Sequence, residues 1–362
     1  MTRPIRIAYV INSVEGGGAA LPVPSVAAVL RRLGAEVRIF ALTPRDRRAV
    51  APMEAAGLAV TVRPGGEKDH AAAARWLDRE LRAWRPTVIW TSLTRATLLG
   101  QLVGLRLRLP VVSWQHAAFL KPANLFLLRR LNRLSRLWIG DSQMISDLTA
   151  ERLGIGPDRL MTWPIFRADP DAMQAPAWKP GETIRIGTLG RLHPVKGYDV
   201  LIAALAMLPP LPVAWEVAIG GDGAERSALE QAIASAGLSH VRLAGYVDPA
   251  SFLAGLHLYV QPSRSEGLCI AAHEAMQAGL PVLASAVGAL TRSIDDRVGR
   301  LVPPGDPAAL AAALADLLRQ PERLAVLGAA GRERLLTHYG PATFEAAGKA
   351  ILDRISTFQA RT

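Results

Sequence analysis

Short apolar runs rich in valine and isoleucine alternate with helical patterns along the whole chain, and this alternation constrains the fold most. Continuous apolar runs are the pattern expected for strands that are buried on both faces. Strands of this kind, separated by helices, build parallel sheets with helices on each side. In the first half, strands are predicted at residues 5–11, 36–42, 58–62, 87–91, 110–114, 137–140 and 159–163.

The alternation is interrupted once. Residues 164–182 contain four prolines and no periodicity, which is typical of a linker. Strands are then predicted at 184–189, 213–219, 241–244, 257–261 and 281–284, with helices near 197–207, 224–236, 268–278 and 306–318. A chain of 362 residues has room for two such domains. The expected fold is therefore α/β, with two doubly wound parallel-sheet domains that face each other across a cleft.

The predicted boundaries follow from these patterns. The first domain is expected over residues 1–165, the linker over 166–182 and the second domain over 183–340. The last helical stretch, 341–362, has no strand after it, and we expect it to complete the first domain. Ligands of doubly wound sheets bind beyond the carboxyl ends of the strands, so a site is sought in the loops there. Ser25 is the expected N-cap of a helix that begins after it.

Composition narrows the function classes. The single cysteine, Cys269, excludes a disulfide framework and a cysteine-based metal cluster, and it indicates a reducing compartment. The chain opens without the apolar core of a signal peptide. No run reaches the roughly 18 apolar residues of a membrane span. We therefore expect a soluble, cytoplasmic protein.

The positive charge is concentrated in the first half. Residues 1–170 contain 25 lysines and arginines against 13 aspartates and glutamates, whereas the remainder contains 17 against 18. This asymmetry is typical of a domain with an anionic partner, either nucleic acid or a membrane surface. A general solubility charge is the alternative.

The loop after the first predicted strand contains Gly16, Gly17 and Gly18. Glycine lets a backbone approach a ligand closely. The stretch does not match G-x-G-x-x-G, however, and Pro22 and Pro24 delay the next helix. A plain loop therefore fits this segment as well as a ligand-binding loop.

Two cations follow the first strand of the second domain. In GRLHPVKG, Arg191 and Lys196 flank the start of a predicted helix, with Gly190 and Gly197 beside them. Two cations and free amides at a helix N-terminus form a diphosphate site. Solvated surface cations are the alternative.

Two carboxylates bracket the segment GLCIAAH. Glu266 precedes the helix predicted at 268–278, and Glu274 lies inside it. Eight residues of helix span roughly 12 Å, which is too far for two carboxyl groups to share a proton. With the amides of residues 267–270 between them, the two carboxylates suit a ligand that has hydroxyls at both ends and a diphosphate in the middle. A nucleotide sugar has this layout.

These segments together resemble a known family. Glu266 and Glu274, GRLHPVKG, IGGDGAERSALEQAI and VRLAGYVD are similar to the retaining glycosyltransferases of the GT-B fold, of the glycogen-synthase-like and mannosyltransferase type (glycosyltransferase family 4, group 1). The resemblance covers nearly all of residues 184–318. In the first domain it rests on the GGG loop and on SWQHAA around His116.

The resemblance implies roles for individual residues. The implied catalytic residues are His116, Glu266, Arg191 and Lys196. Glu266 contacts the donor sugar's hydroxyls, His116 faces the sugar from the first domain, and the two cations neutralise the diphosphate. Glu274 accepts hydrogen bonds from the ribose. The other implied donor-binding residues are Gly16, Gly17, Gly190, Gly267, Leu268, Cys269 and Ile270.

The resemblance also implies an enzyme without metal or cofactor, because basic side chains and a helix N-terminus can stabilise the departing nucleoside diphosphate. The chain departs from the family pattern at Leu268 and Cys269, where Phe-Gly is usual, and over residues 288–292, where Gly-Gly-x-x-Glu is usual. The nucleotide base therefore stays open. The implied activity is transfer of a hexose, with retention, from a UDP- or GDP-linked donor to a hydroxyl acceptor.

Residues 120–138 are predicted to form one amphipathic helix. Its apolar face comprises Leu127, Leu128, Leu131, Leu134 and Trp138. Its basic side comprises Arg129, Arg130, Arg133 and Arg136. Such a helix packs on the sheet with solvated arginines, or it attracts anionic lipid at about 1 kcal/mol per basic residue. The second option predicts a peripheral protein on the inner face of the cytoplasmic membrane. Its acceptor is then a membrane lipid or a lipid-linked saccharide, in glycolipid or surface polysaccharide synthesis.

Other function classes remain open. A sugar-nucleotide epimerase or a non-catalytic nucleotide-sugar sensor could use the same scaffold, and the motifs do not separate these from a transferase. A nucleic-acid-binding protein is disfavoured. Modules that bind single strands interleave aromatic side chains with cations, and the stretches RRL, PRDRRAV and LRLRLP contain no aromatic residue. We expect no nucleic-acid partner.

Overall fold

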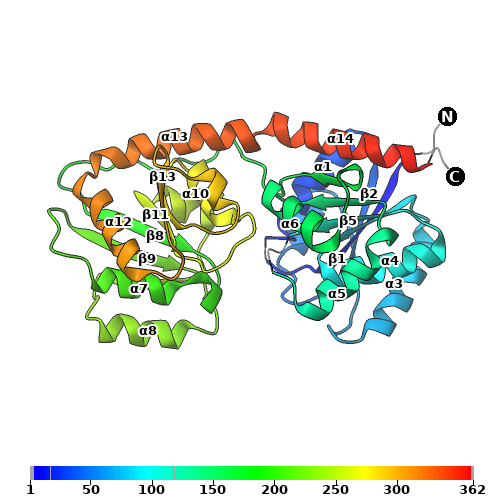
Figure 1. The fold of residues 1–362 in the computed structure, drawn as a ribbon, viewed down its shortest axis with the longest axis horizontal. Coiled ribbons are helices and arrows are strands. Elements are labelled where there is room, and N and C mark those ends of the chain that lie inside the picture. Colours follow the sequence, from blue (N-terminus) through cyan, green and yellow to red (C-terminus); the bar gives the residue numbers. More distant parts are fainter. Residues whose placement is uncertain (1–3, 17, 117–118, 360–362) are drawn as a thin grey trace. The chain divides into compact units, whose positions relative to one another are not determined.

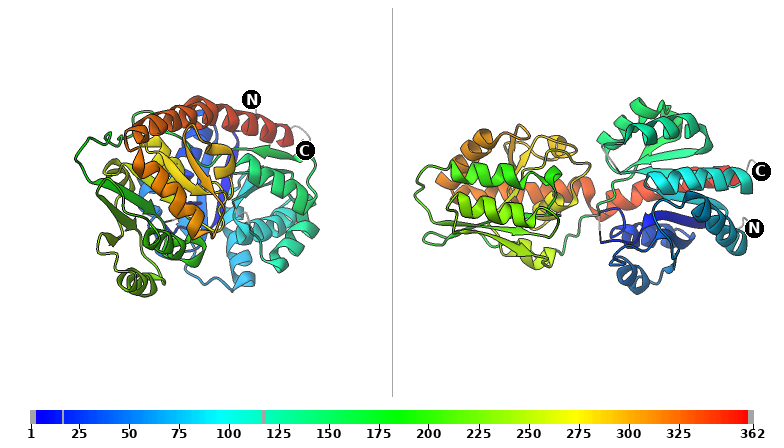
Figure 2. Two further views of the ribbon diagram at one scale, coloured as in Figure 1. Left: turned by 60° about the vertical axis from the view of Figure 1, so that its left-hand side comes forward. Right: turned by 90° about the horizontal axis from the view of Figure 1, so that it is seen from below.

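The computed structural model describes residues 4–16, 18–116 and 119–359. The chain divides into two compact units: unit 1 is Met1–Arg167 with Ala342–Thr362, and unit 2 is Ala168–Pro341. Each unit has its own parallel sheet with helices on both faces (Figures 1 and 2). The expectation of two doubly wound α/β domains is confirmed.

The sheet of unit 1 has seven parallel strands in the order β3-β2-β1-β4-β5-β6-β7. The strands are β1 (Arg6–Ser13), β2 (Glu36–Thr43), β3 (Ala59–Val62), β4 (Val88–Ser92), β5 (Val111–Gln115), β6 (Leu137–Gly140) and β7 (Leu160–Thr162). They match the seven strands predicted from the apolar runs. The strand order reverses between β1 and β4, so the carboxyl ends of the central strands border a ligand-binding edge.

Seven helices accompany this sheet in the described part of unit 1. They are α1 (Val23–Arg32), α2 (Val50–Ala55), α3 (His70–Trp84), α4 (Thr94–Leu107), α5 (Pro122–Leu131), α6 (Gln143–Leu153) and α14 (Pro341–Gln359), with short 3-10 turns η1 (Asn132–Leu134) and η2 (Pro157–Arg159). With α14 the chain returns to unit 1, as Figure 1 shows in red. Its Phe344 is buried against Trp163, with 5.2 Å between ring centroids.

Two helix predictions in unit 1 were wrong. Ser25 lies inside α1, because Pro22 and Pro24 suit the first turn of a helix and allow it to begin at Val23. Residues 120–138 do not form one helix: α5 ends at Leu131, and Trp138 is a fully buried residue of β6. The leucine spacing extended past the true end of the helix because β6 begins with apolar residues as well.

The sheet of unit 2 has six parallel strands in the order β10-β9-β8-β11-β12-β13. The strands are β8 (Ile184–Leu189), β9 (Trp215–Gly220), β10 (Val241–Gly245), β11 (Leu258–Gln261), β12 (Val282–Ser285) and β13 (Gly299–Val302). The helices are α7 (Tyr198–Ala206), α8 (Arg226–Ser235), α9 (Pro249–Ala254), α10 (Ile270–Gln277), α11 (Leu290–Ser293), α12 (Pro307–Arg319) and α13 (Glu322–Tyr339), with the 3-10 turn η3 (Pro194–Lys196). The edge strand β13 and helices α9, α11 and α13 were not predicted.

The segment interpreted as a linker, 166–182, mostly packs as part of unit 2. The amide of Ala168 donates to the Tyr339 carbonyl, at 2.8 Å, and the amide of Ala175 donates to the Ala278 carbonyl, also at 2.8 Å. Trp178 packs against the core of unit 2. Prolines removed the periodicity of this segment, but these two amides find acceptors elsewhere on the unit. Within the described residues, no helix is long and apolar enough to cross a membrane.

Candidate functional site

Glycine loops at the carboxyl ends of β8 and β9 form the floor of a site in unit 2. Gly190 follows β8, and Gly221 and Gly223 follow β9. A Cβ added to Gly221 would overlap the carbonyl of Gly190, and one added to Gly223 would overlap the carbonyl of Leu192. The loops therefore lie backbone to backbone, which leaves the adjacent Arg191 exposed at the strand ends.

Glu266 and Lys196 form the central pair of this site. Lys196 Nζ donates to Glu266 Oε1 at 2.8 Å. The same oxygen accepts from Ser263 Oγ at 2.6 Å and from Gln261 Nε2 at 3.3 Å. All three contacts converge on Oε1, and no nitrogen or hydroxyl group in the described part of the chain donates to Oε2. The Cys269 thiol also interacts with this carboxylate, as a weak donor. The carboxylate is thus held firmly through Oε1, and Oε2 lacks a strong donor.

The electrostatics of Lys196 and Arg191 favour an anion. Burial lowers the pKa of Lys196, but the negative charge and the hydrogen bond of the Glu266 carboxylate oppose this effect, and the pKa lies above its usual value. Arg191 acts on Lys196 as a like charge, so the two cations are neighbours. The Lys196 ammonium is therefore charged at neutral pH, and it lies beside the exposed Arg191 on the edge where a ligand would bind.

Glu274 lies on α10, and its side chain is partly exposed. The partial burial raises its pKa above the usual value. Across the described residues, no side chain or backbone group forms a hydrogen bond or ion pair with this carboxylate. A partly buried carboxylate without a partner is destabilising. Donors from a ligand, such as hydroxyl groups, would offset that effect.

The chain enters α10 through an unusual turn. Cys269 is the N-cap residue and adopts a left-handed conformation, with φ of +64°. The side chains of Leu268 and Cys269 are buried, so only their backbone can contact a ligand. Burial also raises the pKa of the Cys269 thiol, which stays neutral. In the described structure, the amides of Gly267 and Leu268 donate to no protein group. Both remain available for a ligand beside the N-terminus of α10, which begins at Ile270.

His116 lies in a separate cluster in unit 1, just after β5. Its Nε2 is 2.8 Å from Ser92 Oγ, at the end of β4, and its Nδ1 is 3.4 Å from Asp141 Oδ2, just after β6. Both partners are buried, and burial raises the pKa of Asp141. Ser92 is fully buried, so the arrangement cannot present a serine nucleophile to a substrate. Instead, Ser92 and Asp141 fix the orientation of the imidazole.

The glycine loop after β1 gives little support to the predicted ligand contact. The amide of Gly16 donates to Asp46 Oδ1 at 3.0 Å and is occupied by the protein itself. The second glycine of the prediction, Gly17, lies outside the described residues.

One sequence motif, Asp-x-Asp, could supply metal ligands. The chain contains a single Asp-x-Asp triplet, Asp169-Pro170-Asp171. Both aspartates are exposed, and the Asp171 amide donates to Asp169 Oδ1 at 3.0 Å, which forms a local turn. Among the described residues, no group of three or more His, Cys, Asp or Glu side chains could hold a metal ion.

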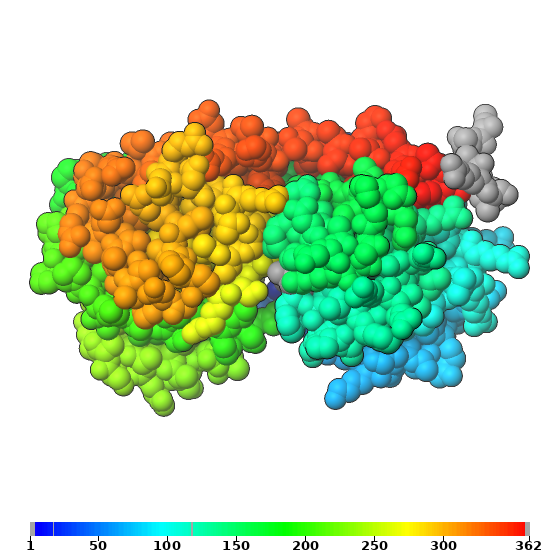
Figure 3. Space-filling model, viewed as in Figure 1, coloured from blue at the N-terminus to red at the C-terminus, as the bar shows by residue number. Residues whose placement is uncertain are grey.

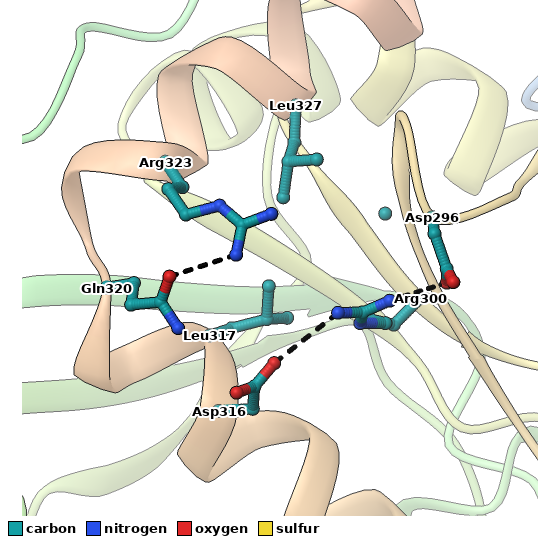
Figure 4. Close-up of a pocket in the computed structure, with 8 residues that line it drawn as sticks. Asp296, Arg300, Asp316, Leu317, Gln320, Arg323 and Leu327 are labelled. Carbon is teal, nitrogen blue, oxygen red and sulfur yellow. Dashed lines mark hydrogen bonds and ion pairs between the residues drawn. The ribbon is translucent and has the colours of Figure 1, made fainter.

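A small recess at the amino end of β13 is not a candidate site. Arg300 pairs with Asp296 at 2.6 Å and with Asp316 at 3.5 Å, and Arg323 is bonded to Gln320 (Figure 4). The recess has a volume of about 10 Å³, and both arginines that line it are bonded to other lining residues. Its groups satisfy one another.

Sequence reasoning missed the residues that hold the predicted ones in place. Gln261 and Ser263 orient Glu266, and Ser92 and Asp141 orient His116. These polar residues end a strand or closely follow one, which is the one sequence signal that could have identified them. The structure brings Arg191, Lys196 and Glu266 together, with Glu274 on the adjacent helix. His116, by contrast, lies in unit 1.

Two family profiles match the chain. Residues 171–334 match "Glycosyl transferases group 1", and residues 16–166 match "Glycosyltransferase Family 4". Together they span most of both units.

Curated relatives are similar at modest identity. A D-inositol 3-phosphate glycosyltransferase of Segniliparus rotundus is 27% identical over 75% of this chain and 66% of its own length. A phosphatidyl-myo-inositol mannosyltransferase of Mycobacterium leprae is 29% identical over 84% of this chain and 84% of its own length. The chain spans less than half the length of some other curated relatives that it matches.

Solved structures share the fold. Anabaena HepE, crystallised with UDP-glucose, superposes with a TM-score of 0.84 at 20% identity, over 97% of this chain and 100% of that one. At this identity the likeness concerns the fold alone.

Proposed function

Because the chain belongs to the group 1 glycosyltransferases of glycosyltransferase family 4, which have the GT-B fold, we propose that it transfers a sugar from a nucleoside diphosphate to a hydroxyl acceptor. The observation that carries the proposal is the set of groups around the N-terminus of α10. Lys196 and Arg191 supply positive charge, Glu266 keeps one oxygen available, and Glu274 lacks a partner among the described residues. A diphosphate flanked by a hexose and a ribose satisfies all four.

In this mechanism, side chains and backbone amides of the protein bind the diphosphate of the donor. Arg191, Lys196 and the free amides before α10 stabilise the negative charge that develops as the diphosphate departs. Glu266 Oε2 accepts hydrogen bonds from sugar hydroxyls, and Glu274 accepts them from the ribose. The diphosphate takes the proton of the acceptor hydroxyl on the same face of the sugar, so the anomeric configuration is retained. The mechanism calls on neither a metal nor a cofactor.

His116 would support the sugar from unit 1. Its ring nitrogens face Ser92 and Asp141, so a direct bond to a sugar hydroxyl requires one of these contacts to be exchanged. The contact to Asp141, at 3.4 Å, is the longer one and the easier to replace.

The donor is proposed to be UDP- or GDP-linked. Anabaena HepE, which has the same fold, was crystallised with UDP-glucose, and this favours UDP. Thermal-shift measurements with UDP-, GDP- and ADP-sugars identify the base. Following the donor with and without acceptors then separates a transferase from the alternatives: an epimerase isomerises it unaided, and a sensor leaves it intact.

The cationic pair provides the sharpest test of this proposal. Arg191→Ala and Lys196→Ala are each expected to lower kcat about 10²-fold, on the scale of losing one contact to a developing charge. Arg319→Ala is the matched control, because Arg319 is also exposed and carries the same charge but lies on α12. Near-normal turnover in both Arg191→Ala and Lys196→Ala would disprove the diphosphate assignment.

The acceptor is proposed to be a membrane lipid or lipid-linked saccharide, with the protein peripheral on the inner face of the cytoplasmic membrane. On α5, Phe126 and Leu127 are exposed, by 59% and 43%, next to the exposed Arg129 and Arg130. Helix α5 lies on the face of unit 1 that Figure 3 shows. Apolar and basic side chains exposed together suit the surface of an anionic bilayer.

Vesicle co-sedimentation tests the membrane proposal. Anionic vesicles should retain the protein at low salt and release it at high salt, whereas neutral vesicles should bind it weakly. Arg129→Gln with Arg130→Gln should reduce binding, and Arg242→Gln with Arg319→Gln in unit 2 should not. A soluble acceptor would be indicated if anionic vesicles retained no more protein than neutral ones and the arginine substitutions changed neither binding nor activity.

A further inference from the structure

A basic pocket in unit 1 shares no residue with either cluster described above. Its volume is about 350 Å³. It is lined chiefly by Arg133, Arg136, Arg159, Arg354, Thr357 and Phe358. These residues come from η1, the approach to β6, η2 and the last turns of α14. The pocket therefore borders the amino ends of β6 and β7, whereas His116 and Asp141 follow carboxyl ends of the same sheet.

The four guanidinium groups of the pocket lack counter-charges. No aspartate or glutamate lines it, and none of the four arginines forms an ion pair within the described ranges. Elsewhere in unit 1, Arg45, Arg63 and Arg95 each pair with a carboxylate. The recess of Figure 4 likewise balances Arg300 with two aspartates. Four like charges around one cavity repel one another, and a bound anion would offset that cost.

Backbone carbonyls and an aromatic ring hold three of these arginines. Arg159 Nη2 donates to the Asn132 carbonyl at 2.6 Å and to the Ser135 carbonyl at 2.9 Å. Arg354 Nη2 donates to the Asp158 carbonyl at 2.8 Å. The Arg136 guanidinium lies over the Phe358 ring, 5.8 Å from its centroid. These contacts orient the groups without neutralising them, which preorganises donors for a ligand.

We propose that this pocket binds a phosphate-bearing ligand, either a soluble phosphorylated molecule or the phosphate of a lipid headgroup. Fork-shaped arginine donors match the oxygens of a phosphate group. The volume exceeds that of one phosphate, and Phe358 offers an apolar wall for the organic part. The site is independent of sugar transfer. It also assigns Arg133 and Arg136 to a pocket, and leaves Arg129 and Arg130 on the open surface of α5.

The first experiment titrates pyrophosphate calorimetrically into the full chain that carries Arg191→Ala and Lys196→Ala, so that the proposed donor site does not contribute. Arg133→Gln with Arg136→Gln should weaken binding by about tenfold or more, the scale of lost charged hydrogen bonds. Arg129→Gln with Arg130→Gln is the matched control: it removes the same charge from neighbouring exposed positions and should change binding less than about twofold. Thr357→Phe should also weaken binding, because it fills the pocket without changing charge.

Vesicles distinguish the two sources of phosphate. If the ligand is a lipid headgroup, Arg133→Gln with Arg136→Gln weakens binding to phosphatidic acid vesicles even though Arg129 and Arg130 of α5 are intact, and pyrophosphate competes with these vesicles for the wild-type protein. If the ligand is soluble, vesicle binding is unchanged and only the pyrophosphate affinity falls. The proposal is overturned if pyrophosphate does not bind, or if the Arg129/Arg130 control pair loses as much affinity as the pocket pair, with each variant shown to be folded by circular dichroism.

Discussion

At the scale of single residues, His273 shows how burial decides the role of an ionisable group. Its Nδ1 lies 3.0 Å from the Cys269 carbonyl and its Nε2 lies 3.0 Å from Ser293 Oγ, so it links the start of α10 to α11. Burial lowers its pKa from 6.5 to about 4. The imidazole is therefore neutral in the folded protein and serves the structure, not the transfer of protons.

This shift predicts a pH dependence of stability. Between pH 6.5 and pH 4 the unfolded chain binds a proton at His273 that the folded chain does not. The stabilisation is therefore complete above the unfolded pKa and is lost as pH falls through the folded pKa, by about 3 kcal/mol. Urea unfolding of the full chain at pH 7 and pH 4, followed in unit 2, is the measurement. Between these pH values the free energy of unfolding should fall less in His273→Asn than in the wild type. The same pH dependence in both proteins would refute this role for His273.

At the scale of elements, Gly288 holds the loop before α10 in position. It has a φ of +59°, and an added Cβ would overlap the Gly267 carbonyl and lie 2.6 Å from the Glu266 carbonyl. The next residue, Ala289, donates its amide to the Gly267 carbonyl at 2.9 Å. The β12–α11 connection therefore supports the loop that carries Glu266.

Gly288→Ala should displace this loop and weaken donor use. We expect kcat/KM to fall roughly tenfold or more, because small displacements of positioning groups are costly in catalysis. Gly305→Ala is the control: Gly305 also has a positive φ, of +75°, but an added Cβ meets no atom within 4 Å. That variant should lose only about 1–2 kcal/mol of stability and keep its kcat/KM. If both variants keep normal kinetics, Gly288 does not position the loop.

At the scale of the whole molecule, the chain ends in the unit where it began. Helix α14 packs Phe344 against Trp163, and Gly348 lies so close to Trp163 and Val29 that an added Cβ would be 2.7 Å from each. Trp163 also stacks on Trp114, at 5.5 Å. The C-terminal helix is thus part of the aromatic core of unit 1.

Phe344→Ala should destabilise unit 1 by about 3–5 kcal/mol, the usual cost of removing a buried aromatic ring. Because each unit has its own core, hydrogen exchange should accelerate in the strands of unit 1 and stay unchanged in those of unit 2. Val326 lies on α13 and is 69% exposed. Val326→Ala is therefore the control, and it should leave hydrogen exchange unchanged in both units. Acceleration confined to α14 alone would show that the helix is dispensable for the core.

Sequence alone determined every strand except β13, the two-domain α/β plan and the grouping of Arg191, Lys196 and Glu266. Buried strands leave an apolar run that can be read locally, and parallel sheets gather the carboxyl ends of their strands at one edge. Residues that directly follow strands could therefore be grouped without coordinates. The glycine usual in the family at the position of Cys269 also has a local reason, because the backbone there is left-handed.

Tertiary structure decided the contacts that have no periodic signature. Segment 168–182 packs with unit 2 because two of its amides donate to carbonyls over 100 residues away in sequence, one just after α10 and one at the end of α13. Ser92 and Asp141 met His116 only because β4, β5 and β6 are neighbours. The basic pocket needed Arg133 and Arg354, which lie more than 200 residues apart. Such long-range contacts depend on how the elements pack. Packing is set by shape and burial across the whole unit, and no local sequence pattern encodes these.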